Sequence, residues 1–345
     1  MYDTAHREFG DALSVGCFSK KFIRVPGGIL QKEDWRVLQV AKNSATAAAP
    51  TSLAKRRQAS TLRAAAVFLA PIFILIAIFI VYPIIDNFKT SFYQWNGISA
   101  NKIWVGLDNW KKLLHDTRFW TAFYHNVIIM ICSIIIQIPI GLLLATFLDA
   151  GGKKLNIFKV IWFLPLLMSS VAIGFLFQYA LATNGGIVST ISKLFGGGNV
   201  DLLGSPKLAL FTVIMVIAWQ FTPFYMVYFM AGYSGIDTDV YEASLIDGAN
   251  RAKYTRYIAL PLLKPTIKNA CILSLIGSLK YFDLIYVMTG GGPGTSTDVM
   301  ATYMYSTSFS SFNMGYGSAI AGGMFILITT IAVIIRKILT GKGED

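Results

Sequence analysis

The sequence has few of the residues from which enzymes build metal sites or nucleophilic centres. Its 345 residues include 3 cysteines and 3 histidines, and charged residues make up 14% of the chain. Cys17, Cys132 and Cys271 are widely separated, and neither a disulfide framework nor a metal-ligand spacing follows from them. The histidines are also scattered, without an HExxH pattern or a paired carboxylate. We therefore predict no metal site, no catalytic residues and no enzymatic activity in this chain.

A phosphate-binding loop is missing as well. The glycine-rich turn at residues 289–297 lacks the Lys-Ser/Thr and the helix start that a Walker A motif requires, and no such motif occurs elsewhere. We therefore expect the chain to bind no cofactor itself.

What the sequence does contain is apolar residues. They make up 54% of the chain, and the mean hydropathy is +0.56, which is too high for a soluble domain of this length. The net charge of +12 is spread among the ends of apolar segments and does not form one basic patch, so we predict no nucleic-acid partner. The composition indicates an all-α polytopic membrane protein in contact with the lipid bilayer.

Apolar runs near the ~20 residues that a helix needs to cross a bilayer occur six times. A proline lies well inside each of the first four runs, where neighbouring helices can accommodate it in a bundle. Each proline can be interpreted in two ways, as a feature of helix geometry or as a gating hinge, and the sequence does not choose between them. The predicted spans are residues 62–83, 124–148, 157–181, 208–232, 263–288 and 318–339, with Pro71, Pro139, Pro165 and Pro223 inside the first four.

The distribution of Lys and Arg predicts the orientation. With a cytoplasmic amino terminus, the inner segments hold 22 Lys and Arg residues and the outer segments hold 7. Leaving out the amino-terminal charges far from the first span still leaves 15 against 7. The positive-inside rule therefore predicts that both termini are cytoplasmic.

The parts outside the spans have distinct compositions. Residues 1–61 are polar and rich in Ala, Ser and Thr, which predicts a flexible cytoplasmic extension without a cleavable signal peptide. Residues 341–345 form a tail after a predicted permease-like domain at 62–340. The first outer loop, residues 91–120, is dense in aromatic residues, as expected for chain at the membrane interface or at a docking site. The sequence leaves both interpretations open.

A polar, basic segment, residues 241–261, interrupts the apolar pattern between the fourth and fifth spans. Asp239 is a good N-cap and Glu242 follows three residues later, a spacing that predicts a capping box and a short helix from Val240. Gly248 is predicted to end that helix, because glycine adopts a left-handed C-cap without a Cβ penalty.

A second short helix is predicted over residues 250–260, stopped by Pro261. Small residues beside the glycine corner would let another surface approach closely. These residues are Ala243, Ser244 and Ala249.

The pattern Glu242-Ala243-Ser244, then Gly248 six residues after the glutamate, then Ile258-Ala259-Leu260-Pro261, resembles the EAA loop of permease subunits from binding-protein-dependent ABC importers. Ser244 replaces the second alanine, a small-for-small change. The glycine-proline turn after the fifth span and the GYGSA stretch at 315–319 are similar to the larger-subunit group of maltose-type carbohydrate permeases.

The resemblance implies a type I importer fold with a cytoplasmic coupling loop at about 233–262. It also implies a bacterial inner-membrane location and a set of partners. These are a second homologous permease, two ATP-binding cassette subunits that bind ATP and Mg²⁺, and an external or periplasmic solute-binding protein. By motif position, the residues that would couple to the ATPase are Glu242, Ala243, Ser244, Gly248 and Ala249.

A substrate path is expected along the fourth and fifth spans, because polar side chains at membrane depth point inward or to water. Ser274, Ser278 and Tyr281 are predicted to share one helix face. Helix packing is the alternative for each residue, and Lys280 could pair with Asp283 or meet an acidic sugar. By resemblance to the maltose-type permeases and by these charges, the candidate residues are Gln220, Phe221, Phe224, Ser274, Ser278, Lys280, Tyr281 and Asp283.

Other classes of membrane protein compete with an importer of sugars. An ATPase-independent secondary transporter should show discontinuous helices or intramembrane carboxylates for ion coupling, and it would leave the EAA-like segment unexplained. An ABC permease for another solute, such as glycerol phosphate, an amino acid or a peptide, shares every motif named above. The sequence favours an ABC importer permease and leaves the identity of its solute open.

Overall fold

The fold was examined in a computed structural model, which describes residues 24–25, 28–29, 52–151 and 155–339. The predicted tail at 341–345 and most of the predicted extension at 1–61 lie outside the described residues. The chain divides into two compact units, Met1–Ile78 and Phe79–Asp345.

The first unit contains a small hairpin and a long helix. Strand β1 (Arg24–Val25) pairs antiparallel with β2 (Gly28–Ile29). Helix α3 (Ser52–Ile76) contains Pro71, and a π-helical turn, η1 (Ala77–Val81), includes the boundary between the units.

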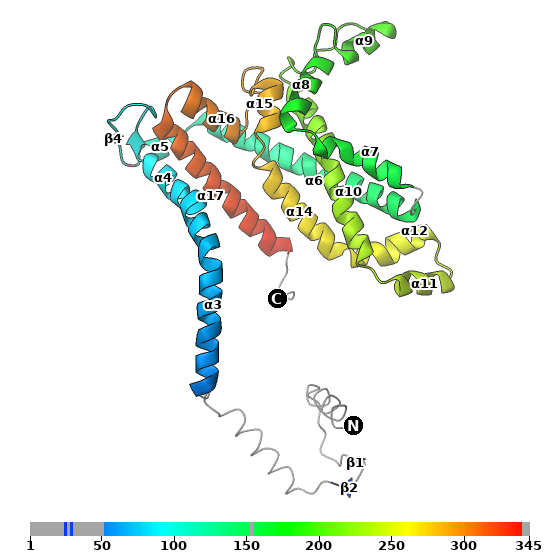
Figure 1. The fold of residues 1–345 in the computed structure, drawn as a ribbon. Helices are drawn as coiled ribbons and strands as arrows, with labels where there is room; N and C mark the ends of the chain where they lie inside the picture. Colours follow the sequence, from blue (N-terminus) through cyan, green and yellow to red (C-terminus); the bar gives the residue numbers. More distant parts are fainter. Residues whose placement is uncertain (1–23, 26–27, 30–51, 152–154, 340–345) are drawn as a thin grey trace. The chain divides into compact units, whose positions relative to one another are not determined.

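The second unit is almost entirely helical, as the apolar runs predicted (Figure 1). Strands β3 and β4 form a short antiparallel hairpin in the aromatic-rich loop. In chain order its elements are α4 (Tyr82–Thr90), β3 (Tyr93–Gln94), β4 (Ile103–Trp104), α5 (Asp108–Leu114), α6 (Thr117–Gly151), α7 (Asn156–Leu167), α8 (Ser170–Ala180), α9 (Ile187–Leu194), α10 (Ala209–Ser234), α11 (Thr238–Ile246), α12 (Arg251–Tyr254), η3 (Thr255–Ala259), α13 (Leu260–Leu262), α14 (Lys264–Ser278), α15 (Asp283–Thr289), α16 (Met300–Tyr305), η4 (Ser306–Ser310) and α17 (Met314–Leu339).

Membrane-spanning capacity agrees with the predicted fold class. Among the described residues, 4 helices are long and apolar enough to cross a membrane, or up to 6 if each of two bent pairs is one span. The bent pairs are Ile157–Leu167 with Ser170–Ala180, at 93°, and Arg251–Leu262 with Lys264–Ser278, at 66°. The single helices are Ala64–Thr90, Thr117–Gly151, Ala209–Ser234 and Met314–Ile338.

The predicted third span, 157–181, is broken and not merely kinked. Pro165 lies inside α7 and lacks the N–H that would continue the helical ladder. Met168 then adopts an extended backbone with ψ 144°, and the Ser169 side chain caps α8 by accepting a hydrogen bond from Val171 N at 3.3 Å.

The prediction of one continuous helix over 263–288 is wrong. Helix α14 ends at Ser278 and α15 begins at Asp283. Between them Phe282 has φ −138° and ψ −62°, which is outside the helical region. Hydropathy reports the length of an apolar run but not the local backbone, so the break was invisible to it. The expected tight turn after this region is confirmed, because Gly290 caps α15 with a left-handed φ of 60°.

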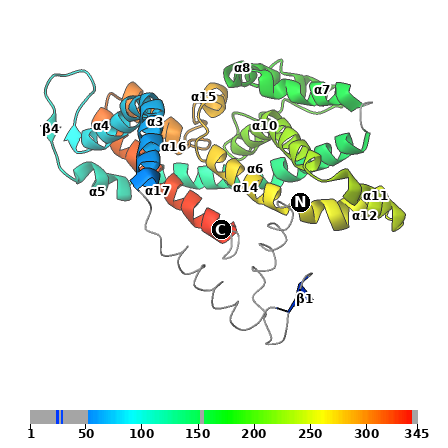
Figure 2. The ribbon, with the colours of Figure 1, turned by 60° about the horizontal axis from the view of Figure 1, so that its bottom comes forward.

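The centre of the second unit is formed by α6, α10 and α14, which pack against one another (Figures 1 and 2). One buried cluster joins α6, α8, α10 and α15 around Ile129, Ile217 and Ile285. Another joins α6 and α10 to α12 and α14 around Phe229 and Ala270. The polar segment and the break between α14 and α15 are therefore both attached to the same packed core.

A polar network fastens the start of α6 to α16 and α17. Tyr303 OH donates to Asp116 Oδ2 at 2.5 Å, and Tyr316 OH donates to the same oxygen. Burial of Asp116 opposes its ionisation, but the hydrogen bonds from Tyr303 and Tyr316 outweigh burial and lower its pKa below 3.8. Burial and the neighbouring Asp116 carboxylate raise the pKa of Tyr303 to about 12.

Candidate functional site

Helix α11 of the polar segment starts two residues earlier than predicted. Asp237, not Asp239, is the N-cap, and its Oδ1 accepts a hydrogen bond from Asp239 N at 3.0 Å. Both aspartates can cap a helix, and the earlier start places Asp239 in the first turn, where its charge meets the positive end of the helix. The predicted capping box between Asp239 and Glu242 is therefore wrong.

The glycine corner has the predicted conformation. Gly248 has φ +75° and follows the last turn of α11. Its N–H donates to Leu245 O at 3.0 Å, and Ala249 N donates to Ser244 O at 2.9 Å. These two bonds form a Schellman motif, which satisfies carbonyls that the helix end would leave free.

The EAA-like residues divide between the surface and the interior. Glu242, Ala243 and Gly248 are exposed, and Ala249 is half-buried. Ser244 is 3% exposed, and its hydroxyl donates to Tyr241 O at 2.6 Å. Ser244 therefore supports the turn from inside and does not present its side chain on the surface.

Two exposed apolar residues next to the motif were missed by the sequence reasoning. Leu245 is 48% exposed and Ile246 is 88% exposed. Apolar side chains on the surface of a polar segment commonly mark a contact with another protein. The signal available in the sequence was an apolar pair directly before the glycine corner.

The second half of the segment does not stop at Pro261. Asn250 Oδ1 accepts from Lys253 N at 2.9 Å and caps α12. The chain then continues through η3 and α13 to Leu262. A π-helical turn changes the hydrogen-bond register ahead of the proline, so the missing N–H of Pro261 does not end the helix.

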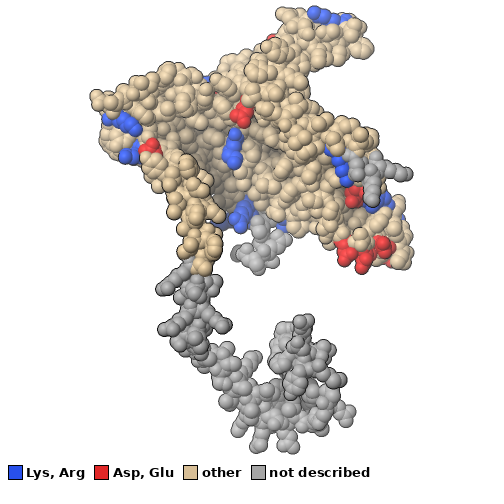
Figure 3. Space-filling model, in the orientation of Figure 1, with Lys and Arg blue, Asp and Glu red and all other residues tan. Residues whose placement is uncertain are grey.

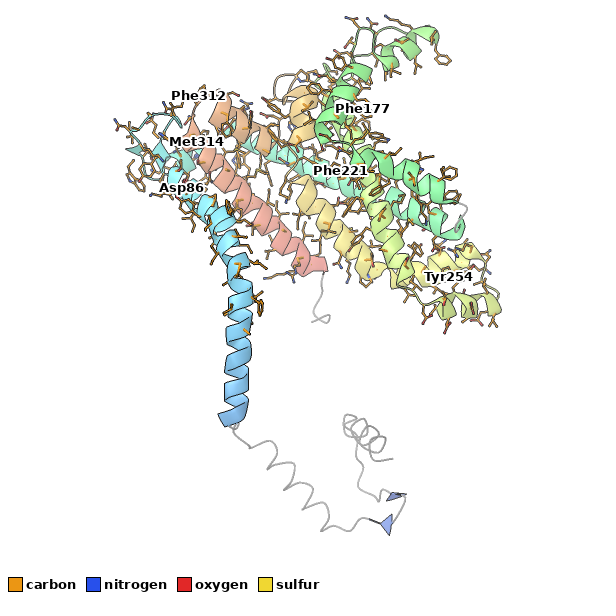
Figure 4. The ribbon with its side chains drawn as sticks, viewed as in Figure 1. Asp86, Phe177, Phe221, Tyr254, Phe312 and Met314 are labelled. Atoms are coloured by element: carbon orange, nitrogen blue, oxygen red, sulfur yellow. The ribbon has the colours of Figure 1, made fainter. Side chains whose placement is uncertain are left out.

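Arg251 anchors the polar segment to α6. Its guanidinium forms an ion pair with Asp149 near the end of α6. Its Cζ lies 5.0 Å from the centre of the Tyr241 ring and 5.5 Å from that of Tyr254, and the two rings meet edge-on with centres 4.8 Å apart. Figure 4 labels Tyr254 at this junction. Movement of the segment would therefore be transmitted to α6 through these contacts.

Three of the predicted path residues are buried within this chain. Gln220, Ser274 and Ser278 are all 2% exposed or less. Gln220 Nε2 donates to Ser170 Oγ on α8 at 3.2 Å, and Ser278 Oγ donates to Ser274 O at 2.7 Å. In the described part of the chain, Gln220 Oε1 and Ser274 Oγ have no hydrogen-bond partner.

Tyr281 does not lie on the helix face shared by Ser274 and Ser278, because it belongs to the break after α14. Its hydroxyl lies beside the side chain of Gln137 on α6. Its ring packs at 5.5 Å from Phe221, which Figure 4 labels on α10. Tyr281 and Phe221 are therefore neighbours, and the irregular backbone after α14, not a helix face, places Tyr281 there.

The remaining path residues face outward from the chain. Phe224 is 40% exposed, and Lys280 and Asp283 are exposed. No ion pair joins Lys280 to Asp283 in the region that the structure describes. Figure 3 shows an acidic and a basic side chain close together in the central part of this face, at the level where α14 gives way to α15.

Polar residues on α6 were also missed. Ser133 and Gln137 are each 1% exposed. Across residues 64–151 and 157–338, nothing hydrogen-bonds to Ser133 Oγ or Gln137 Nε2. Their spacing of four residues inside an apolar run was a readable sign of one polar helix face. No group of three His, Cys, Asp or Glu side chains that could hold a metal ion occurs in the described ranges.

Comparison with known proteins assigns the family. Residues 137–342 match the model for the inner membrane component of binding-protein-dependent transport systems. The chain belongs to this family. It is 35% identical to a probable ABC transporter permease protein of Pyrococcus horikoshii, over 81% of this chain and 96% of that protein.

Further relatives agree with this family. A trehalose/maltose transport system permease protein of Thermococcus litoralis is 31% identical over 78% of this chain and 90% of its own length. A solved bacterial ABC transporter involved in the import of the acidic polysaccharide alginate superposes with a TM-score of 0.71 and 24% identity, covering 84% of this chain and 98% of the other. That superposition confirms the type I permease fold.

Proposed function

We propose that this permease is one of two membrane subunits of an ATP-driven importer that takes up a sugar or oligosaccharide. The trehalose/maltose permease relative supports the class of solute, since it aligns over 90% of its own length. The exposed side chains of Phe224, Lys280 and Asp283 support a path shared with a second permease, because charged side chains beside an apolar span face water or protein.

The polar segment would couple this path to ATP hydrolysis. Glu242, Ala243 and Gly248 would contact an ATP-binding cassette subunit, while Ser244 and Ala249 hold the turn that presents them. In this proposal ATP and Mg²⁺ bind to two such partner subunits, both termini are cytoplasmic, and a solute-binding protein delivers the sugar on the other side. Closure of the ATPase pair would switch the path between inward-open and outward-open states.

The test is uptake by proteoliposomes that contain the permease with its partner subunits and solute-binding protein. The panel is maltose, trehalose, maltotriose and a mannuronate trimer, with glycerol 3-phosphate and a dipeptide as other solutes. Uptake of a saccharide that requires ATP supports the proposal. Uptake of the other solutes alone overturns the sugar assignment, and uptake without the ATPase subunits overturns the importer assignment.

Lys280 favours an anionic sugar as a second candidate, because its exposed ammonium has no ion-pair partner among the described residues. We expect Lys280→Gln to reduce uptake of the mannuronate trimer and to leave uptake of maltotriose unchanged. Equal uptake of the trimer by Lys280→Gln and the unmodified permease would rule out an acidic substrate held by this residue.

A further inference from the structure

Four aromatic rings form a contiguous group next to the break between α14 and α15. Phe282 stacks on Tyr286 with centres 5.1 Å apart and planes 18° apart. Tyr305, at the end of α16, lies 5.2 Å from Phe282 and 5.0 Å from Tyr286, so these three rings form a triangle. Phe309, in η4, extends the group at 5.1 Å from Tyr305. We call these residues the four-ring cluster.

The four-ring cluster is open and is not part of a core. Tyr286 is 42% exposed and Phe309 is 52% exposed, while Phe282 and Tyr305 are half-buried. None of the four belongs to a buried hydrophobic cluster in the part of the chain that the structure describes. The Tyr286 and Tyr305 rings lie 5.0 Å apart and each carries a hydroxyl, so the open surface offers both aromatic and polar groups.

The four-ring cluster and the charges beside it are poorly suited to contact with lipid. Asp283 and Tyr286 are three residues apart on α15 and share a helix face, and Lys280 is exposed in the adjoining break. The candidate span that contains α14 ends at Ser278, so these charges and the break lie just beyond it. Charged side chains and irregular backbone beside a span are stable against water or another protein and not against lipid.

The composition favours a solute over a partner helix. Helices that pack in membranes use small residues, which let the backbones approach closely. The four-ring cluster instead has large aromatic faces beside a few polar groups, which is the composition of ligand sites. A sugar ring has an apolar C–H face that can lie on an aromatic ring, and its hydroxyls can bond to the Asp283 carboxylate and the tyrosine hydroxyls.

We propose that the four-ring cluster is a binding subsite for a sugar ring of the transported solute. This inference rests on the proposed function. Phe282, Tyr286 and Tyr305 form a compact group with Phe309 at its edge, which gives an aromatic surface beside the break.

Thiol labelling tests whether the four-ring cluster faces water. Cys17, Cys132 and Cys271 are replaced by alanine, and Tyr286→Cys and Phe309→Cys are introduced separately into the assembled transporter in proteoliposomes. The membrane-impermeant reagent MTSET is expected to label both positions while Ile135→Cys stays unlabelled, because Ile135 is 64% exposed on an apolar face of α6. Failure of both cysteines to react in the assembled transporter would overturn the proposal.

Uptake then tests the ligand, with the saccharide from the panel above that the unmodified transporter takes up fastest. We expect Tyr286→Leu and Phe309→Leu to raise KM about threefold to tenfold, the range that loss of an aromatic stacking contact gives, with the maximal rate unchanged. Phe195→Leu on the same protein is the matched control, because Phe195 is 87% exposed and lies outside the cluster.

The results of these experiments distinguish a failure of the subsite from a failure of the proposed function. An unchanged KM in both leucine variants, with saccharide uptake intact, overturns the subsite but not the sugar importer. Loss of the second permease from the purified complex of either variant shows a subunit interface and also overturns the subsite. Absence of saccharide uptake by the unmodified transporter overturns both.

Discussion

The backbone conformation of Gly248 determines the turn between the two halves of the polar segment. With a φ of +75°, it holds the Schellman turn between α11 and α12 in a region that L side chains rarely adopt. A Cβ atom added there would meet nothing within 4 Å, so a substitution acts on the backbone and not on packing. The same turn exposes Glu242 and Ala243 while Ser244 stays inside.

We expect Gly248→Asp to insert into the membrane normally but to separate ATP hydrolysis from uptake. A strained left-handed residue costs ~1–2 kcal/mol, and a tenfold loss of uptake corresponds to ~1.4 kcal/mol. Uptake and ATPase rates of the reconstituted complex measure the effect. Asparagine and aspartate tolerate this conformation alike, so Gly248→Asn separates the effect of the added carboxylate charge from that of the backbone. Gly198→Asp, at an open glycine without a positive φ, is the control. Normal coupled uptake by Gly248→Asp would contradict a role in coupling.

At the scale of elements, the candidate functional residues lie at helix ends and breaks, while the residues of the buried hydrophobic clusters lie mostly in the middle of helices. The polar segment is held to the end of α6 by Arg251 and Asp149. The exposed charges and the four-ring cluster lie where α14 stops and α15 starts. The start of α6 is held to α16 and α17 through Asp116.

The Arg251–Asp149 pair should link the motion of the polar segment to α6. The side chains are 33% and 36% exposed, so solvent screening limits the pair to about 0.5–1 kcal/mol. We expect Arg251→Gln and Asp149→Asn each to reduce uptake, and the double variant to be no worse than the worse single variant. A double-mutant cycle on uptake rates measures this, and fully additive losses would show that the pair does not act as a unit.

The Asp116 network predicts an acid limit to stability. Because the folded protein lowers the pKa of Asp116 below 3.8, its stabilisation is present above that value and is lost as the pH falls through the lower folded pKa. Thermal unfolding in detergent between pH 6 and pH 3 measures the loss. We expect Asp116→Asn to flatten the acid side of this profile, and Tyr303→Phe to make it shallower by removing one of the hydrogen bonds. An identical acid profile for Asp116→Asn and the unmodified permease would contradict the assignment.

At the scale of the whole molecule, the proposed function makes this chain half of a path. Phe224, Lys280 and Asp283 are exposed in the single chain, whereas Gln220, Ser274 and Ser278 are buried inside it. The solute should therefore meet the first group directly, while the second group positions α8, α10 and α14.

The charge distribution of the whole chain predicts its orientation. The 22 Lys and Arg residues of the inner segments, against 7 in the outer segments, put both ends of the chain in the cytoplasm. We expect a fluorescent protein fused to the C-terminus to be fluorescent and alkaline phosphatase fused there to be inactive. A fusion at the loop of residues 195–205 should behave in the opposite way, and the reverse result at both sites would invert the topology.

The sequence by itself determined the membrane class, the positions of most apolar spans and the glycine-cornered polar segment. Each of these follows from local chemistry: the length of apolar runs, the distribution of charge, and the freedom of glycine at Gly248. It also singled out Lys280 and Asp283, because charges inside an apolar run are rare.

Only the tertiary structure decided which polar residues are accessible. It placed Gln220 against Ser170, moved Tyr281 off the helix face of Ser274, and opened the break where Phe282 meets Tyr305. It also chose Asp237 over Asp239 as the N-cap, although both can cap a helix. The placement of Gln220 and the meeting of Phe282 with Tyr305 depend on contacts between segments far apart in the sequence, and periodicity within one segment holds no information about them.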